Sequence, residues 1–172
     1  MTKEELLQKR ISAISLGCDK NKVDLENMFG RLKSYGFTIT DAVEEADIVI
    51  VNTCAFIQSA QEEAIANILQ VEHLKKMGVI EKIIVTGCFP ERNYASMKEN
   101  FPSLDAYLRL RENENIISVV EDLYEVPHAK PIKSFERVLT NTPSYAYLKI
   151  SDGCNNVCSY CTIPRIRGRY QS

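Results

Sequence analysis

Residues 48–54 read IVIVNTC and begin with the purest apolar run of the chain. A short run of β-branched residues that is ended abruptly by polar ones is typical of a strand buried on both faces of a parallel sheet. Similar runs cover residues 11–16 and 83–85, and a weaker one covers residues 37–40. The sequence therefore predicts a sheet of buried strands, with residues 48–51 among them.

Helical patterns lie between these strands. Apolar residues recur every three or four positions over residues 25–35, and Gly36 can end that helix. A second helix follows residues 59–62, SAQE, which we interpret as a capping box, and Gly78 can end it. Residues 115–124 form a further helical pattern. Because strands and helices alternate, we expect right-handed crossovers and an α/β fold with an open, mainly parallel sheet of flavodoxin-like outline.

The composition divides the chain into three parts. Residues 1–125 carry the alternating strands and helices and form the expected α/β domain. Residues 126–143 contain three prolines and little periodicity, which indicates a linker. Residues 144–172 form the third part, in which residues 145–150, YAYLKI, are predicted to form a new strand ahead of a cysteine-rich loop.

The overall composition argues against several classes of protein. The 172 residues are 45% hydrophobic and 26% charged, and the formal net charge of −2 argues against direct binding of nucleic acid. No apolar run approaches the roughly 18 residues that cross a bilayer, and the N-terminal MTKEELLQKR lacks an apolar signal core. We expect a cytoplasmic protein with no membrane partner. In a reducing cytosol, six cysteines indicate metal binding or catalysis rather than disulfides.

Three cysteines near the end of the sequence, Cys154, Cys158 and Cys161, have the spacing C-x-x-x-C-x-x-C. Thiolates on one tight loop can each bind one iron of a cubane cluster, which leaves the fourth iron open to an exchangeable ligand. The alternative is a structural zinc site, which normally needs four ligands. The two histidines, His73 and His128, are far from the loop in sequence. The spacing therefore favours an iron–sulfur cluster over zinc.

Three earlier cysteines share one position relative to the predicted strands. Cys18, Cys54 and Cys88 each directly follow a strand run. Because the carboxyl ends of parallel strands meet at one edge of a sheet, three thiols there can converge on one metal centre. Gly17 and Gly87 would let the backbone approach that centre closely. The alternatives are a redox disulfide among the three, or cysteines that serve as small buried hydrophobic residues.

The cysteine loop resembles the signature of radical S-adenosylmethionine enzymes, in which the residue before the third cysteine is often aromatic, as Tyr160 is here. The resemblance implies that the open iron binds the amino and carboxylate groups of S-adenosylmethionine. It also implies that Tyr160 lies near the adenine, with simple packing as the alternative role. In such enzymes the loop follows the first strand of a partial barrel, so residues 145–150 would be that strand and the barrel would be truncated here.

Both cysteine groups together resemble the methylthiotransferase family, whose members carry two [4Fe–4S] clusters. The matching motifs are Gly17-Cys18, Asn21, Asn52-Thr53-Cys54, Gly87-Cys88 and the loop that begins at Cys154. The resemblance implies that Cys18, Cys54 and Cys88 hold the auxiliary cluster. It implies equally that the loop cysteines hold the cluster that binds S-adenosylmethionine.

Three segments resemble one branch of this family, namely residues 15–26, 52–57 and 145–154. That branch adds a methylthio group to the β-carbon of an aspartate in a small-subunit ribosomal protein. The resemblance implies the ribosomal protein or the ribosomal subunit and an electron-donor protein as partners, and it assigns no catalytic side chain. The alternatives are the tRNA adenosine methylthiotransferase branch and a non-catalytic binding module stabilised by zinc. Because a full barrel needs about 200 residues or more, we expect an inactive fragment of a longer enzyme.

Charged and polar residues beside the two cysteine groups leave two interpretations open. Asn21 and Asp24, with Glu26, either orient the first cysteine site or start the first long helix. Three arginines follow the loop: Arg165, Arg167 and Arg169. They either contact ribosomal RNA or a carboxylate of substrate or cofactor, or they lie on a solvated segment.

Overall fold

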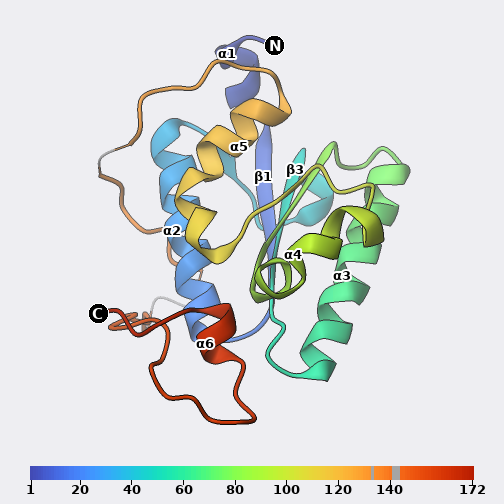
Figure 1. Ribbon diagram of the computed structural model, residues 1–172. Coiled ribbons are helices and arrows are strands. Elements are labelled where there is room, and N and C mark those ends of the chain that lie inside the picture. Colours follow the sequence, from blue (N-terminus) through green and yellow to red (C-terminus); the bar gives the residue numbers. More distant parts are fainter. Residues whose placement is uncertain (133, 141–143) are drawn as a thin grey trace.

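The computed structural model describes residues 1–132, 134–140 and 144–172, with one five-stranded sheet at the centre (Figure 1). The strands are β1 (Arg10–Ser15), β2 (Thr38–Ile39), β3 (Ile48–Thr53), β4 (Lys82–Gly87) and β5 (Ala106–Tyr107). Their order is β2-β1-β3-β4-β5, and every neighbouring pair is parallel. This is the order of flavodoxin-like doubly wound folds, so the expected α/β class is confirmed.

Helices cover both faces of the sheet. They are α1 (Lys3–Leu7), α2 (Asp19–Tyr35), α3 (Gln58–Lys76), α4 (Cys88–Asn100), α5 (Ile116–Leu123) and α6 (Ile163–Ile166), with short 3₁₀ helices η1 (Val43–Glu45) and η2 (Leu110–Asn115). Helices α2 and α5 lie on one face, and α3 and α4 lie on the other (Figure 1). None of these helices, in the described residues, is long and apolar enough to cross a membrane.

Strand β3 is buried on both faces, as its apolar run predicts. Ile48 and Ile50 pack into the core cluster beneath α2 and α5, while Val49 and Val51 pack into the cluster beneath α3 and α4. All four side chains are fully buried. Because successive side chains of a strand point to opposite faces, one four-residue run supplies both cores.

Helix boundaries agree with the sequence in one case and differ in another. Helix α2 ends at Gly36, whose φ of 118° is left-handed, as expected for a glycine that ends a helix. Helix α3 has Ile57 as its N-cap and no side-chain cap hydrogen bond, so the capping-box interpretation of residues 59–62 is wrong. The helix starts earlier than predicted, and those residues lie within its first turns. Helix α4 was not predicted, and its backbone is non-helical at Asn93.

Residues 145–150 do not form the strand that was predicted for them. A strand requires a neighbour that pairs with its backbone N–H and C=O groups. In the described residues, the only backbone bridge near this segment joins Asp152 to Gln171, and the two are antiparallel. The segment therefore has no sheet to join in this structure.

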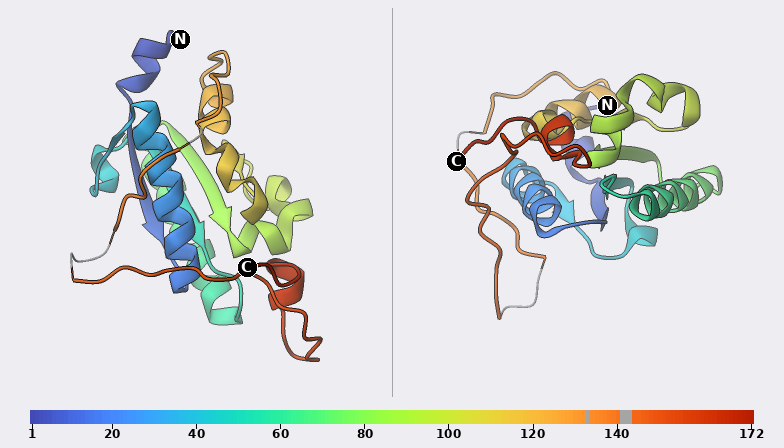
Figure 2. Two further views of the ribbon diagram at one scale, coloured as in Figure 1. Left: turned by 90° about the vertical axis from the view of Figure 1, so that its left-hand side faces the viewer. Right: turned by 60° about the horizontal axis from the view of Figure 1, so that its bottom comes forward.

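Ala129 contacts Glu121 of α5, and residues 134–140 then cross α2 (Figure 2). Glu26 of α2 is fully buried, and its Oε1 accepts a hydrogen bond from the Thr140 backbone at 2.9 Å. The Val138 N–H donates to the Glu26 carbonyl at 3.2 Å. Most of the predicted linker thus contacts the α/β domain, and the domain boundaries at residues 125 and 143 stay predictions.

The backbone conformation and the close packing at Gly87 exclude a larger side chain. Its φ of 97° and ψ of −156° fall in a region essentially restricted to glycine, and a Cβ there would lie 2.7 Å from the Thr53 nitrogen on β3. We predict that Gly87→Ala lowers the free energy of unfolding by about 3 kcal/mol or more, because backbone strain and a clash with β3 add. Urea denaturation followed by far-UV circular dichroism measures this loss.

Gly78→Ala is the matched control for this prediction. Gly78 also has a positive φ, 74°, but nothing lies within 4 Å of its Cβ position. We expect it to cost only about 1 kcal/mol, the strain of a left-handed alanine. Equal losses for the two variants would contradict the steric account of Gly87.

Candidate functional site

Three neighbouring strands end in cysteines at one edge of the sheet. Cys54 directly follows β3, Cys88 directly follows β4 as the first residue of α4, and Cys18 lies just beyond β1 as the N-cap of α2. Because β1, β3 and β4 are adjacent and parallel, these ends share one edge. We call the edge formed by Cys18, Cys54 and Cys88 the cysteine rim. The placement expected from the sequence is the one observed.

Asn21 connects the parts of the cysteine rim. Its side chain is fully buried, and its Oδ1 lies 3.6 Å from the Cys88 Sγ and 4.0 Å from the Cys18 Sγ. Its Nδ2 donates to the carbonyls of Thr53, at 2.8 Å, and Leu16, at 3.3 Å. One amide therefore binds the ends of β1 and β3 and faces two of the three thiols.

Gly17 brings the third cysteine into the same group. A Cβ at Gly17 would lie 2.8 Å from the Cβ of Cys54 and 3.3 Å from its Sγ, and the φ of Gly17 is 97°. The turn from β1 into α2 can pass this close to Cys54 only because residue 17 has no side chain. The three cysteines therefore surround a turn that glycine makes possible.

The three rim cysteines differ in exposure and acidity. Cys18 is exposed, Cys54 is half-buried and Cys88 is 6% exposed. The pKa of the Cys88 thiol is raised to about 11, mainly by burial; the Arg167 guanidinium opposes this shift, and the neighbouring Cys54 and Cys18 contribute to it. All six cysteines lie in described residues and are free thiols, so the disulfide alternative is not realised in this structure.

The two cysteine groups do not have the geometry of a site for a single metal ion. In the part of the chain that the structure describes, no three His, Cys, Asp or Glu side chains lie close enough to hold one ion together. A cubane cluster differs, because its thiolate ligands bind separate iron atoms. Three cysteines without a histidine are a donor set of the kind that holds such a cluster.

The second cysteine group, which we call the cysteine loop, covers residues 154–161 and is open to solvent. Cys158 is exposed, and Cys154 and Cys161 are half-buried. The Cys154 N–H donates to the Gly168 carbonyl at 3.1 Å, which closes the base of the loop. Tyr160 is 88% exposed, so the structure gives no support to a packing role for it.

Arg167 reaches from beyond the loop to the cysteine rim. Its side chain is only 6% exposed. Its guanidinium donates to Asp24 at 3.2 Å, to Asp152 at 2.9 Å and to the Oδ1 of Asn21. The solvated interpretation is therefore wrong for Arg167, and this contact was not foreseen from the sequence. The two partners on α2 are 143 and 146 positions away in the chain, and no spacing pattern links them.

The polar residues at the start of α2 have separate roles. Asn21 faces the thiols of Cys18 and Cys88, and both Asn21 and Asp24 accept hydrogen bonds from Arg167. Glu26 does not, because its carboxylate binds Thr140 on the opposite part of the helix surface. Helix capping was the alternative role, but the N-cap of α2 is Cys18 and makes no side-chain cap hydrogen bond.

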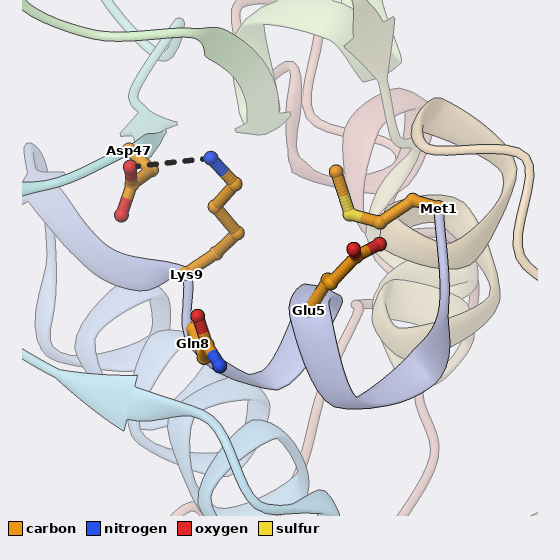
Figure 3. A pocket seen from close by; sticks show the side chains of 5 residues that line it. All are labelled: Met1, Glu5, Gln8, Lys9 and Asp47. Atoms are coloured by element: carbon orange, nitrogen blue, oxygen red, sulfur yellow. Dashed lines mark ion pairs between the residues drawn. The ribbon is translucent and has the colours of Figure 1, made fainter.

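A surface hollow elsewhere on the molecule offers no comparable chemistry. It is lined by Met1, Glu5, Gln8, Lys9 and Asp47, beside α1 (Figure 3). Lys9 pairs with Asp47 at 3.5 Å and with Glu81 at 2.5 Å. Its positive charge is thus already compensated within the protein, and we assign no site there.

Comparisons with known proteins identify a matching family and curated relatives. The family model described as Uncharacterized protein family UPF0004 matches residues 10–109. A protein of Clostridioides difficile (strain 630), named ribosomal protein uS12 methylthiotransferase RimO, is 42% identical over 95% of this chain and 38% of its own length. Proteins of the same name from Syntrophomonas wolfei and Dictyoglomus thermophilum are each 43% identical, over 94% and 95% of this chain and 39% of their own lengths.

These matches cover nearly all of this chain but only part of each relative. The chain spans about two-fifths of the length of the curated relatives it matches. The matched residues 10–109 contain β1 to β5 and the three rim cysteines. The family model covers more than half of the 172 residues. The resemblance to methylthiotransferases is confirmed, and the chain belongs to the UPF0004 family, with relatives named RimO methylthiotransferases.

Proposed function

We propose that this chain provides two iron–sulfur sites for methylthio transfer of the RimO type. The reaction adds a methylthio group to the β-carbon of an aspartate in ribosomal protein uS12. The observation that carries the proposal is the cysteine rim, where a cysteine follows the end of each of three adjacent parallel strands and two of the three thiols face Asn21. The names of the relatives support the substrate, since each is described as a uS12 methylthiotransferase.

The residues that would hold the cofactors fall into two groups. Cys18, Cys54 and Cys88 would bind the auxiliary [4Fe–4S] cluster, and the three cysteines of the loop would bind a second one. When bound, the loop cluster would supply the electron that cleaves S-adenosylmethionine, and the rim cluster would hold the sulfur that is methylated. Neither triad has a fourth cysteine, which leaves one iron of each cluster free for an exchangeable ligand.

The side chains of the chain itself would prepare these sites. The low exposure of Cys88 keeps water from its sulfur, and the Asn21 Oδ1, 3.6 Å from that sulfur, accepts a hydrogen bond from its thiol. The exposed cysteine loop admits a ligand as large as S-adenosylmethionine, and Tyr160 is free to lie along its adenine ring. The partners in this proposal are uS12 or the ribosomal subunit and an electron-donor protein, all in the cytoplasm.

Iron analysis tests the two sites. After anaerobic reconstitution with iron and sulfide, we expect about eight irons per chain, and about four in a Cys154/Cys158/Cys161→Ala variant, because each cubane holds four. A Cys18/Cys54/Cys88→Ala variant is the matched control and should also retain about four. Zinc in place of iron, or no loss in either variant, would reject the cluster assignment and favour a zinc-stabilised binding module.

Cysteine labelling tests the unequal chemistry of the cysteine rim. In the metal-free chain at pH 8, we expect iodoacetamide to modify exposed Cys18 well before Cys88, since the thiolate is the reactive form and the pKa of Cys88 is about 11. Raising the pH toward 11 should accelerate Cys88 labelling, because its thiolate fraction grows. Peptide mass spectrometry reads both sites, and reconstitution should protect all three rim cysteines. Labelling of Cys88 as fast as Cys18 at pH 8 would refute this account.

Product analysis tests the substrate. Deleting the gene that encodes this chain should remove the methylthio group from the aspartate of uS12 and leave methylthio-adenosine in tRNA unchanged, because the relatives act on uS12. Mass spectrometry of uS12 and of digested tRNA measures both products. Loss of methylthio-adenosine with an intact uS12 modification would place the protein in the tRNA branch instead.

A further inference from the structure

A group of four charged side chains joins the base of the cysteine loop to the cysteine rim. Asp24 lies on α2, and the others flank the loop: Lys149 and Asp152 precede it and Arg167 follows it. Lys149 pairs with Asp24, and also with Asp152 at 3.3 Å. Arg167 pairs with Asp24 at 3.2 Å and with Asp152 at 2.9 Å. Both flanks of the loop therefore bind the same carboxylate of α2.

Two members of this group are buried, and the other two are partly exposed. The Arg167 and Asp24 side chains are 6% and 9% exposed. Lys20 of α2 lies 3.8 Å from Asp152 as a further cation, so the two carboxylates face three positive groups. Removing Arg167 would take one of its two cations from the buried Asp24 carboxylate and leave only Lys149, which costs more than losing a surface ion pair.

The same guanidinium also reaches the cysteine rim. One nitrogen of Arg167 donates to the Oδ1 of Asn21, the atom that faces the thiols of Cys18 and Cys88. Next to Arg167, Ile166 of α6 is buried in the core cluster that contains Phe89 of α4. A single short segment thus places a cation at the rim and an apolar anchor against the helix that begins at Cys88.

We propose that Arg167 is a positioning residue that docks the cysteine loop on the cysteine rim through Asp24, Asp152 and Asn21. The docking keeps the two cysteine triads in one mutual arrangement. What the triads bind rests on the proposed function, whereas the docking is a property of the protein without cofactors. Arginine suits this role because its planar guanidinium presents its donors in a rigid fork that contacts Asp24, Asp152 and Asn21, whereas the lysine ammonium is a compact point charge on a flexible stem.

Hydrogen exchange of the full metal-free chain tests the docking. The reporters are the amides of Asp152, Cys154 and Gln171, which close the base of the loop through backbone hydrogen bonds of 2.8, 3.1 and 2.8 Å. We expect Arg167→Ala to accelerate their exchange at least about tenfold, since a buried charge network is broken. Amides of β3 should exchange as in the parent chain, which shows that the α/β domain remains folded.

Three further variants separate docking from a general loss of structure. Arg165→Ala removes an exposed arginine two positions away and should leave the reporters unchanged. Arg167→Lys keeps the charge without the fork and should give an intermediate rate. Asp24→Asn should accelerate exchange of the same amides. The double variant Asp24→Asn/Arg167→Ala should exchange more slowly than the product of the two single effects predicts, because both changes remove the same contact.

The exchange rates test the docking, and the iron content tests the proposed function. Parent-like exchange in Arg167→Ala, or an equal effect of Arg165→Ala, would overturn the docking, and so would multiplicative effects of the Asp24 and Arg167 changes. If Arg167→Ala also accelerates exchange of the β3 amides, the domain itself is disturbed in that variant. Asp24→Asn and Arg167→Lys then test the docking, through faster exchange of the loop-base amides with unchanged exchange of the β3 amides. Iron content after reconstitution is measured on the same samples. A parent chain that binds no iron would refute the proposed function and leave the docking to be judged by exchange alone.

Discussion

The parallel register of β1, β3 and β4 is the constraint on which the other features of the site depend. Ser15 pairs with Asn52, and Thr53 pairs with Gly87, so the three strands finish at nearly the same level. Each connection then leaves the sheet at that level, and the first residues beyond the strands become neighbours in space. A shift of β4 by one residue would turn its side chains to the opposite faces, and Cys88 would no longer meet Asn21.

The sequence was informative where the signal is local. The run of residues 48–51 and the cysteine that follows it lie within seven positions, so strand, strand end and thiol can be read together. The same reasoning located Cys18 and Cys88. It failed for residues 145–150, because a strand depends on a partner that local sequence does not encode. It also missed α4, where the kink at Asn93 interrupts the helical period.

Contacts between distant segments were beyond prediction from the sequence. The three arginines after the cysteine loop left two interpretations open, contact with RNA or a carboxylate or a solvated segment, and Arg165 and Arg169 are exposed. Arg167 differs only because the fold brings Asp24 and Asn21 of α2 to its side chain. The residue type gave no sign of this, since any of the three arginines can pair with a carboxylate. The choice among them is made by the backbone that leads out of α6.

The role of the buried charges follows from the free-energy cost of removing charged groups from water. Buried ion pairs gain little over apolar residues of similar volume, yet they penalise any arrangement in which a partner is missing. The loop they hold has few apolar contacts of its own, with Val157 and Tyr160 94% and 88% exposed. Hydrophobic burial there cannot select one orientation, because it is non-directional. Directed hydrogen bonds from one planar guanidinium to two carboxylates and an amide can select one orientation of the loop. Arg167 therefore determines where the loop lies rather than how stable the domain is.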